Sequence, residues 1–324
     1  MHRRGLERSG IREGSPKRRA GLLSTAIVLG LAGTTAAAIA AIWLPEMEGA
    51  QVLSPLVLLV SALLAPILLR RGRWLLISIL LLCVACQGII LAPYAVGAFP
   101  RSSLGAQEFD RNRPHALIAV LGNSSQDAVK FINSVAADLV LVTDRSSETH
   151  DHLDVLFSGY PQRIERSGWP GIAMLARSNF RIERISGPTL DSLPIIVAKT
   201  KLGSQSYVIV LAHLARPFPF APAGMQRHEA SEIASFIQTI PGPVIVAGDF
   251  NSVPWSTTMA ELSLDGRLQL QFSAGSWPSW MPLPIRLPLD QILTREAKLV
   301  GQLSVGPDLG SDHLPILGVI ELTP

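Results

Sequence analysis

The hydrophobic positions divide the chain into two parts with different periodicities. Before about residue 93, three long apolar runs stand close together: Ala20–Leu44, Val52–Leu69 and Trp74–Leu91. At a rise of ~1.5 Å per residue, each run is about long enough to cross a hydrocarbon core of ~30 Å. The pattern therefore predicts three transmembrane helices over residues 20–93. The first run could also be a secretory signal peptide, but its length and the two runs close behind it favour a retained helix.

After residue 114 the pattern changes to short β-type runs that alternate with helical stretches. The expected strands are His115–Leu121, Leu139–Thr143, Gly171–Ala176, Ile195–Thr200, Tyr207–Ala212, Pro243–Ala247, Pro288–Thr294 and Ile316–Leu322. Helical spacing predicts helices at Gln126–Val135 and Gln226–Thr239. Two sheets packed face to face with helices outside would use these elements economically, so we expect one α/β domain over 115–324. Residues 94–114 are expected to form a linker.

Charge is distributed as unevenly as hydropathy. Up to Leu91 there are ten Lys and Arg and four acids, a net charge of +6, and the remainder has 18 basic and 21 acidic residues, or −3. The mildly acidic second part argues against tight, non-specific binding of nucleic acid through a basic face. Residues 1–19 read as a basic tail, and a second basic flank follows at Arg70-Arg71-Gly72-Arg73.

The two basic flanks also predict an orientation in the membrane. Three crossings put both flanks on the same side, whereas the loop that holds Glu46 and Glu48 has no Lys or Arg. By the positive-inside rule the tail is cytoplasmic. We therefore expect a multi-pass protein of the cell (inner) membrane with its 115–324 domain outside the cytoplasm. The only cysteines, Cys83 and Cys86, lie in the third apolar run, so a disulfide framework or a thiolate zinc site is excluded from that domain.

The first chemical signal is Val244-Ile-Val-Ala-Gly-Asp-Phe-Asn251, an apolar strand that runs into Gly248, Asp249 and Asn251. Residues two apart on an extended segment face the same side, so the carboxylate and the amide are expected to point together. A carboxylate can accept a proton from water, and an amide can donate to a phosphate oxygen. The alternative is an ordinary polar turn at the strand end.

Two further signals place an acid or a histidine beside an apolar strand. Gly310-Ser-Asp-His-Leu-Pro315 precedes the last strand, and its Asp312 suits Mg²⁺ whereas its His313 suits proton transfer or stabilisation of phosphoryl charge. Leu287-Pro-Leu-Asp-Gln-Ile-Leu293 puts Asp290 in an otherwise apolar strand. A buried carboxylate needs a partner, and orienting the His313 ring would supply one. Taken alone, an Asp-His pair in a turn is more often structural.

Together, in this order and spacing, the three segments resemble the endonuclease/exonuclease/phosphatase superfamily, over about Ala116 to Leu322. The segment Ser276-Trp-Pro-Ser-Trp280 resembles its bacterial membrane-anchored branch. The resemblance implies a DNase-I-like fold, a four-layer α/β/β/α sandwich behind the three-helix transmembrane region. It also implies a divalent cation, Mg²⁺ or Mn²⁺, and hydrolysis of a phosphate ester.

Carried over residue by residue, the resemblance assigns the following roles. Asn123 in Leu121-Gly-Asn123 supports the metal, Asp144 at the end of Leu139–Thr143 ligates it, and Asp312 lies on the metal side. Asp249 activates the attacking water, and Asn251 orients the phosphate. Asp290 is paired with the catalytic His313, and His213 in Leu211-Ala-His-Leu214 completes the catalytic set. Arg216, three residues later, is a candidate phosphate contact or a surface arginine.

Asp144 stands where the family has Glu, and its side chain is one methylene shorter. Asp144, Glu148 or another acid could therefore be the ligand, and a capping role for Asp144 is the alternative. Trp169, Trp255, Trp277 and Trp280 fit either core packing or a substrate mouth or lipid interface.

The implied function is a membrane-anchored, metal-dependent phosphoesterase. Metal-activated water would attack phosphorus with Asp249 as base, while His313 stabilises the transition state. Two alternatives stay open: an extracytoplasmic nuclease of the same superfamily, and a membrane-anchored binding module that has lost turnover.

Overall fold

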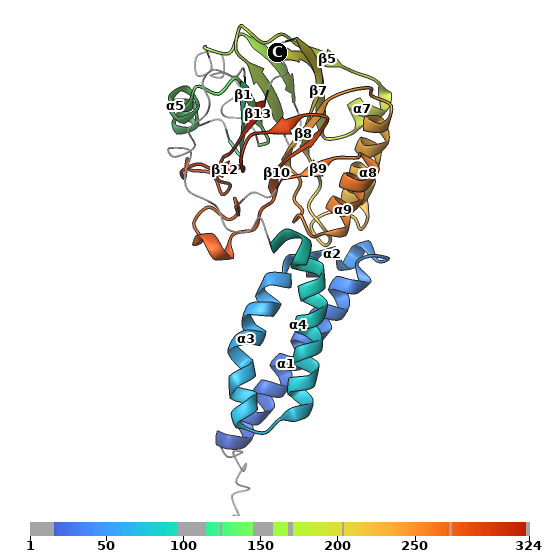
Figure 1. Ribbon diagram of the computed structural model, residues 1–324, viewed down its shortest axis with the longest axis vertical. Helices are drawn as coiled ribbons and strands as arrows, with labels where there is room; N and C mark the ends of the chain where they lie inside the picture. Colours follow the sequence, from blue (N-terminus) through green and yellow to red (C-terminus); the bar gives the residue numbers. More distant parts are fainter. Residues whose placement is uncertain are drawn as a thin grey trace, which may run out of the picture.

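The computed structural model describes residues 16–95, 115–123, 125–144, 158–167, 171–202, 204–271 and 274–321. Figure 1 shows a helical stem below a globular domain. The expected tail at 1–19 is described only from residue 16, and most of the expected linker at 94–114 lies outside the described residues.

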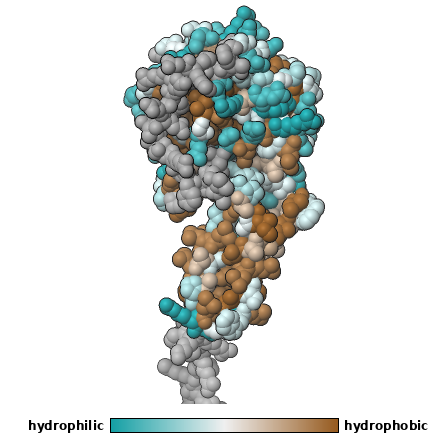
Figure 2. All heavy atoms as spheres, viewed as in Figure 1, coloured by the Kyte–Doolittle hydropathy of each residue, from teal (hydrophilic) through white to brown (hydrophobic). Residues whose placement is uncertain are grey.

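The stem is built from three long helices, α1 (Pro16–Ala40), α3 (Ser54–Arg70) and α4 (Trp74–Ala95). Val28, Leu68 and Leu80 are buried between them, whereas many other large apolar side chains, such as Ile89, face outward. A helix bundle that is apolar on its outside as well as its inside is typical of a membrane region. Figure 2 shows this hydrophobic surface over much of the stem.

Two of the three helices are long and apolar enough to cross a membrane by themselves, at Ala20–Ala40 and Trp74–Tyr94. The remaining expected span, Val52–Leu69, satisfies the same test only when Pro45–Val52 and Ser54–Arg70, which are bent by 50° at their junction, count as one. The expected loop after α1 is folded into η1 (Pro45–Met47) and α2 (Glu48–Val52), so α3 starts only at Ser54. Three crossings therefore remain a proposal.

The globular domain contains two mixed sheets. Sheet A has the order β11-β13-β1-β2-β4-β3, with β12 paired to β13, and sheet B has the order β5-β6-β7-β8-β10-β9. The strands of sheet A are β1 (His115–Leu121), β2 (Leu139–Val142), β3 (Gln162–Arg166), β4 (Ile172–Ala176), β11 (Lys298–Leu299), β12 (Ser304–Val305) and β13 (Ile316–Glu321). Those of sheet B are β5 (Ile182–Ile185), β6 (Ile195–Leu202), β7 (Gln205–His213), β8 (Val244–Asp249), β9 (Gln269–Leu270) and β10 (Asp290–Arg295).

The alternation of side chains along the strands produces the layers. In β1, Ile118 and Val120 point into the core between the two sheets, and Ala119 and Leu121 pack outward against α5 (Gln126–Val135). On the outer face of sheet B, α7 (Pro188–Ser192), α8 (Met225–Gln238) and α9 (Thr257–Asp265) cover a third cluster. The expected sandwich of two sheets is confirmed, and helices lie on both outer faces (Figure 1).

All eight expected strands form, and β1 and α5 have the expected bounds. The strands that the sequence pattern missed are short or charged strands, mostly at the sheet edges, such as β3 with the residues Gln-Arg-Ile-Glu-Arg. Edge strands expose polar side chains, so they lack the apolar run that identified the others. The short helix η4 (Leu283–Ile285), inside the long connection from β9 to β10, was also not expected.

Stem and domain are joined by an apolar cluster and by polar contacts. In the cluster, Val253, Trp255 and Leu289 of the domain pack against Val52 of α2 and against residues of α4, among them Tyr94. The stem, residues 16–95 with α1 to α4, is called the anchor below.

The polar contacts of this junction centre on two buried residues of α2. The Gln51 side chain accepts from the Thr257 backbone N–H at 2.9 Å and donates to the Thr257 hydroxyl at 2.9 Å. Glu48 Oε1 accepts from Arg227 Nη2 at 2.8 Å and from the hydroxyl of Thr258 at 2.9 Å. The short helix thus fixes the start of α9 and one face of α8 to the anchor.

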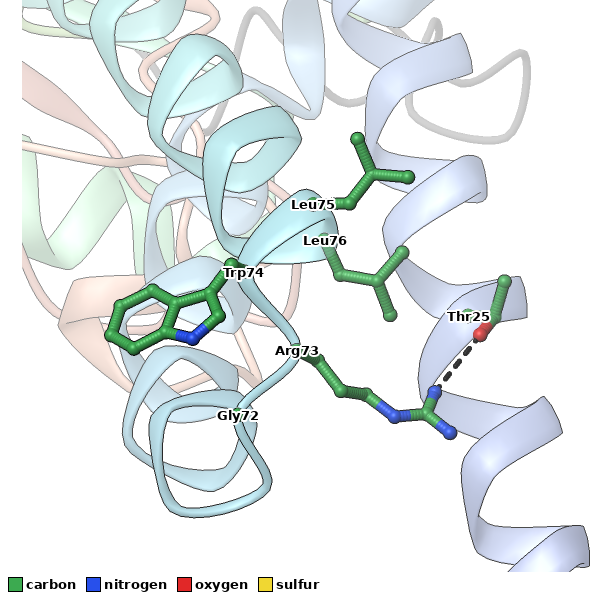
Figure 3. Close-up of a pocket in the computed structure, with 6 residues that line it drawn as sticks. All are labelled: Thr25, Gly72, Arg73, Trp74, Leu75 and Leu76. Carbon is green, nitrogen blue, oxygen red and sulfur yellow. Dashed lines mark hydrogen bonds between the residues drawn. The ribbon is translucent and has the colours of Figure 1, made fainter.

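The opposite end of the anchor is closed by Arg73, in the turn between α3 and α4. Its Nη1 donates to the carbonyl of Gly21 at 2.7 Å and to the hydroxyls of Ser24 and Thr25 at 3.2 and 3.1 Å. A hollow of about 450 Å³ lies beside it, lined by Thr25 and by residues 72–76 (Figure 3). The hollow is at the far end of the stem from the domain (Figure 1), so it has no part in the chemistry described below.

Candidate active site

Three polar side chains meet because they occupy one row across neighbouring strands of sheet B. His213 at the end of β7 is paired with Asp249 at the end of β8, and Asp249 is paired with Asp290 at the start of β10. His213 Nε2 lies 3.5 Å from Asp249 Oδ2. The other ring nitrogen of His213, Nδ1, contacts the carbonyl oxygen of Thr143 in the opposite sheet, so that nitrogen is the one that carries a hydrogen as a donor.

Gly248 makes the close approach of β7 and β8 feasible. Its φ is +148°, and a Cβ added there would lie 1.9 Å from the carbonyl oxygen of Ala212 on β7. No side chain fits at that distance, so glycine is required immediately before Asp249.

His313 reaches this row from the other sheet. It lies just before β13 of sheet A, and its Nδ1 is 2.8 Å from Asp290 Oδ2, a hydrogen-bond distance. Its Nε2 is 3.7 Å from Asp249 Oδ2. The Ser276 hydroxyl donates to the same Asp290 oxygen at 2.5 Å and is fully buried. The expected pairing of Asp290 with His313 is therefore present in the structure, with Ser276 as an additional partner that sequence reasoning missed.

Burial and neighbouring charge set the protonation of this cluster. Burial raises the pKa of Asp249 to about 6; Asp290 acts in the same direction, and His313 and His213 oppose it. Burial alone would lower the pKa of His313, but the charge of Asp290 and its hydrogen bond, with Asp249 and Asp312, raise it to about 9. At neutral pH a charged imidazolium thus lies beside a carboxylate that can still accept a proton.

Asn251 differs from the expected extended geometry. The strand ends at Asp249, and Asn251 has a left-handed backbone with φ +47°. Its backbone N–H donates to Asp249 Oδ1 at 2.8 Å, and its Nδ2 donates to the Leu214 carbonyl at 2.8 Å. One of the two amide hydrogens is therefore used within the protein, and the Asn side chain shapes a turn as well as offering a donor.

The expected metal residues lie at neighbouring strand ends. Asn123 follows Gly122, whose place next to His313 is so tight that an added Cβ would lie 2.8 Å from the His313 Cβ. Asp144 follows Thr143, whose carbonyl contacts His213. Asp312 precedes His313, and its Oδ2 accepts from Trp277 Nε1 at 3.2 Å. Glu148, the alternative ligand, lies outside the described residues.

A second set of potential ligand atoms comes from Asp249, Asp290 and His313, which lie within 4.8 Å of one another. One of the two ring nitrogens of His313, Nδ1, is already hydrogen-bonded to Asp290. Mg²⁺ prefers oxygen ligands, which Asn123, Asp144 and Asp312 offer without disturbing that bond. The donor chemistry of these three residues therefore fits a hard divalent cation better than the Asp–Asp–His cluster does.

The last predicted residue, Arg216, is exposed on the loop after β7 and forms no ion pair with any other described residue. Among the described residues, no hydrogen bond or ion pair links it to the cluster. Gln226 of α8 was not predicted, although it is buried and its Nε2 donates to the carbonyls of Ala215, Phe250 and Asn251 at 2.8–3.0 Å. A helix glutamine has no distinguishing sequence signal, which explains the omission.

Solved structures with the same fold come from distant organisms. An endonuclease/exonuclease/phosphatase from Bacteroides vulgatus is 14% identical, with a TM-score of 0.52, and covers 64% of this chain and 99% of its own. D. rerio TDP2 complexed with single strand DNA product is 16% identical, with a TM-score of 0.53 and the same coverage. The human Nocturnin catalytic domain with bound sulfate anion is 17% identical, with a TM-score of 0.50, and covers 65% and 94%. At these identities the likeness is one of fold.

The sequence itself identifies the family. No curated protein matches it. Residues 104–313, well over half of the chain, match the Endonuclease/Exonuclease/phosphatase family. The chain therefore belongs to the Endonuclease/Exonuclease/phosphatase family, whose enzymes are hydrolases of phosphate ester bonds.

Proposed function

We propose that this protein is a membrane-anchored, metal-dependent phosphoesterase that hydrolyses an extracytoplasmic phosphate ester. The observation that carries the proposal is the hydrogen-bonded pair of His313 and Asp290 beside the buried Asp249, with 3.7 Å between His313 Nε2 and Asp249 Oδ2. A base and a cationic donor that face the same small space are the parts that water attack on a phosphoryl group requires.

In the proposed mechanism Asp249 orients a water molecule and accepts its proton. His313 Nε2 donates to a phosphoryl oxygen as negative charge develops, while Asp290 holds the ring through Nδ1 and Ser276 holds Asp290. A divalent cation, Mg²⁺ or Mn²⁺, at Asn123, Asp144 and Asp312 would polarise a non-bridging oxygen and shield its charge. The second amide hydrogen of Asn251, which is not used by the Leu214 carbonyl, and the His213 ring would provide further polar contacts to the phosphate.

The location outside the cytoplasm is supported by the ends of the anchor. Arg73 bonds to the Gly21 carbonyl and Arg71 to the Ala20 carbonyl at 3.4 Å, so both basic flanks gather at one end. The catalytic domain sits at the other end (Figure 1). By the positive-inside rule the basic end is cytoplasmic. A reporter fused after residue 324 that is active only in the cytoplasm would contradict this orientation.

The enzymatic test uses the full chain in detergent or nanodiscs with bis-p-nitrophenyl phosphate and Mg²⁺, Mn²⁺ or EDTA. Asp249→Asn and His313→Ala should each reduce kcat by about 10²- to 10³-fold, as does the loss of one charge-stabilising group elsewhere. Matched controls are Asp265→Asn and His228→Ala, which change exposed residues of the same types on α9 and α8.

The alternatives predict different results in the same assay. Turnover that disappears for both site variants but not for the controls supports the proposed roles, and near-full activity of either site variant refutes them. A binding module would show no turnover with any metal. A nuclease would act on DNA with a steep dependence on salt, because it must displace counterions from many phosphates.

A further inference from the structure

Two loops of the catalytic domain expose large apolar side chains on the side of the anchor. The loop from Pro217 to Gly224 exposes Phe218 and, at 78% of its surface, Phe220. The loop from Ser279 to Arg286, which contains η4, exposes Trp280 at 72% and also Leu283 and Ile285. These five residues are called the apolar rim below. Soluble domains seldom expose so many large apolar side chains in two loops, and such exposed apolar groups usually mark a surface that contacts another molecule or a membrane.

The first loop lies level with the upper end of the anchor. The Phe218 carbonyl oxygen is 3.6 Å from the Cβ position of Gly49 in α2, and the Cβ position of Gly224 is 3.8 Å from Pro45. The anchor exposes apolar side chains at the same level, including Trp43 at 72%. Tryptophan at the end of a membrane helix is typical of the boundary between hydrocarbon and water.

The second loop connects the rim to the catalytic histidine. Its Ser279 N–H donates to the Asp312 carbonyl at 2.8 Å, and the Ser279 hydroxyl donates to the Ser311 carbonyl at 2.7 Å. Just before this loop, the Trp277 ring lies 6.5 Å from the His313 ring, centroid to centroid. η4 is at the lower edge of the domain in Figure 1, beside the upper ends of the anchor helices. Figure 2 shows hydrophobic residues at this edge, whereas the far end of the domain is mainly hydrophilic.

The catalytic row itself faces the same end of the domain. Leu289 directly precedes Asp290, and Val253 and Trp255 follow Asp249 on the next loop. All three pack against α2 and α4 in the cluster that joins domain and anchor. The carboxylates therefore lie in the part of the domain that packs against the anchor.

From this arrangement we infer that the apolar rim rests in the interface of the bilayer and presents the catalytic site to the phosphate ester of a lipid headgroup. The inference depends on the proposed function and adds the substrate class. The oxygen of water bonds to phosphorus while Asp249 accepts its proton, and the ester P–O bond breaks with its electron pair on the leaving oxygen. The leaving oxygen takes up a proton from solvent and becomes the alcohol, and Asp249 returns its proton to solvent. The products are an alcohol and a phosphate with one ester bond fewer.

Bilayer contact is tested without any reference to activity. Single cysteines at Phe220 and Leu283, in a chain with Cys83→Ala and Cys86→Ala, are labelled with bimane in vesicles that contain spin-labelled phosphatidylcholine. The control is a cysteine at Leu264, which is 76% exposed near the end of α9. That end of α9 lies far from the anchor. The neighbouring helix α8 starts beside Pro45 of the anchor and rises about 21 Å over its 14 residues. Its last residue, Gln238, donates to the carbonyl of Asp265, the last residue of α9.

Labels at Phe220 and Leu283 should be quenched at least about twofold more strongly than the label at Leu264, because short-range quenching needs proximity to lipid. Quenching equal to that at Leu264 would overturn the contact between rim and bilayer.

The substrate class is tested by comparing two substrates for each variant. The double variant Phe220→Ser/Trp280→Ser and the control Leu264→Ser are reconstituted in vesicles of phosphatidylethanolamine, phosphatidylglycerol and phosphatidylcholine. Headgroup release is measured by mass spectrometry, beside hydrolysis of bis-p-nitrophenyl phosphate. The double variant should lose about tenfold or more of its lipid turnover, because it binds the interface less deeply, and should keep the soluble turnover within about twofold. Leu264→Ser should keep both.

The failures of the two proposals are distinguishable. Wild-type protein that hydrolyses the soluble ester but none of these lipids would overturn the substrate class and leave the proposed function intact. An equal loss of both activities in the double variant would show damage to the fold and overturn the role of the rim. Absence of turnover on every substrate would refute the phosphoesterase and the lipid substrate together.

Discussion

The contact between Arg227 and Glu48 gives a prediction about how the catalytic domain is held on its anchor. The Arg227→Met variant keeps most of the apolar stem of the side chain but removes the guanidinium, which donates to Glu48 at 2.8 and 3.1 Å and to the Ala41 carbonyl at 2.7 Å. Glu48 is 5% exposed, so its charge would be left buried, with the Thr258 hydroxyl as the donor that remains among the described residues.

The size of the effect follows from burial. Removing one partner of a fully buried ion pair costs about 3–5 kcal/mol. The Arg227 side chain is 17% exposed and the Thr258 hydroxyl remains, so we take about 2 kcal/mol, which corresponds to a roughly 30-fold larger opening equilibrium of the junction. The exposed pair of Arg184 and Asp191, at the other end of the domain, should contribute little, so Arg184→Met is the control.

The backbone N–H of Thr257 is a direct probe, because it donates across the junction to Gln51. Its exchange with deuterium, measured by NMR in nanodiscs, reports how often the junction opens. Exchange should be about 30-fold faster in Arg227→Met and unchanged in Arg184→Met. A double variant Arg227→Met/Glu48→Gln should exchange more slowly than the sum of the two single effects predicts. Unchanged exchange in Arg227→Met, or strictly additive effects, would refute the reasoning.

Three further predictions concern the catalytic site. Ser276→Ala should lower kcat by about tenfold while KM stays nearly constant, because it loosens Asp290 without touching substrate; an unchanged kcat in steady-state kinetics would deny Ser276 a positioning role. Gly248→Ala should lower the free energy of unfolding by more than about 2 kcal/mol, and therefore Tm in a thermal melt, because its methyl group meets the Ala212 carbonyl; a wild-type Tm would mean that the β7–β8 contact is looser than described. EDTA should abolish turnover and Mg²⁺ restore it, and Asp144→Ala should raise the half-saturating Mg²⁺ concentration by about tenfold or more; saturation at the wild-type concentration would point to another ligand, such as an acid in the 145–157 segment.

Much of the fold could be predicted because its signals are local. The central strands are apolar on both faces, so a continuous run of Val, Ile, Leu and Ala identified β1, β2, β7 and β8. The charged strands β3 and β5 lack such runs, because each lies at the edge of its sheet and leaves most of its side chains at least partly exposed. The bend between α2 and α3 was missed for a different reason: α2 is stabilised by contacts with Thr257, Thr258 and Arg227, which are about 200 residues away in the chain.

The residues of the candidate site likewise include some that local sequence signals identified and some that they could not. Asp249, Asp290 and His313 could be identified because each stands beside an apolar strand, and the structure brings them together. The buried partner Ser276 could not, because its role depends on a hydrogen bond over 14 positions of chain. The extended geometry expected for Asn251 was wrong, since a bond from its backbone to the preceding carboxylate turns the chain. The roles of all the predicted site residues stay predictions: Asn123, Asp144, His213, Arg216, Asp249, Asn251, Asp290, Asp312 and His313.

The origin of His313 in one sheet and of its partners in the other has a consequence for how the enzyme would fail on heating. His213, Asp249 and Asp290 are spaced by the backbone ladder of a single sheet, which resists stretching. The distance from His313 to Asp290 instead depends on how the two sheets slide over each other, which is opposed by side-chain packing and by a few side-chain contacts, such as that of His213 with the Thr143 carbonyl. Activity should therefore vanish a few degrees before the secondary structure melts, and enlarging a residue in the layer between the sheets would harm turnover before it harms expression.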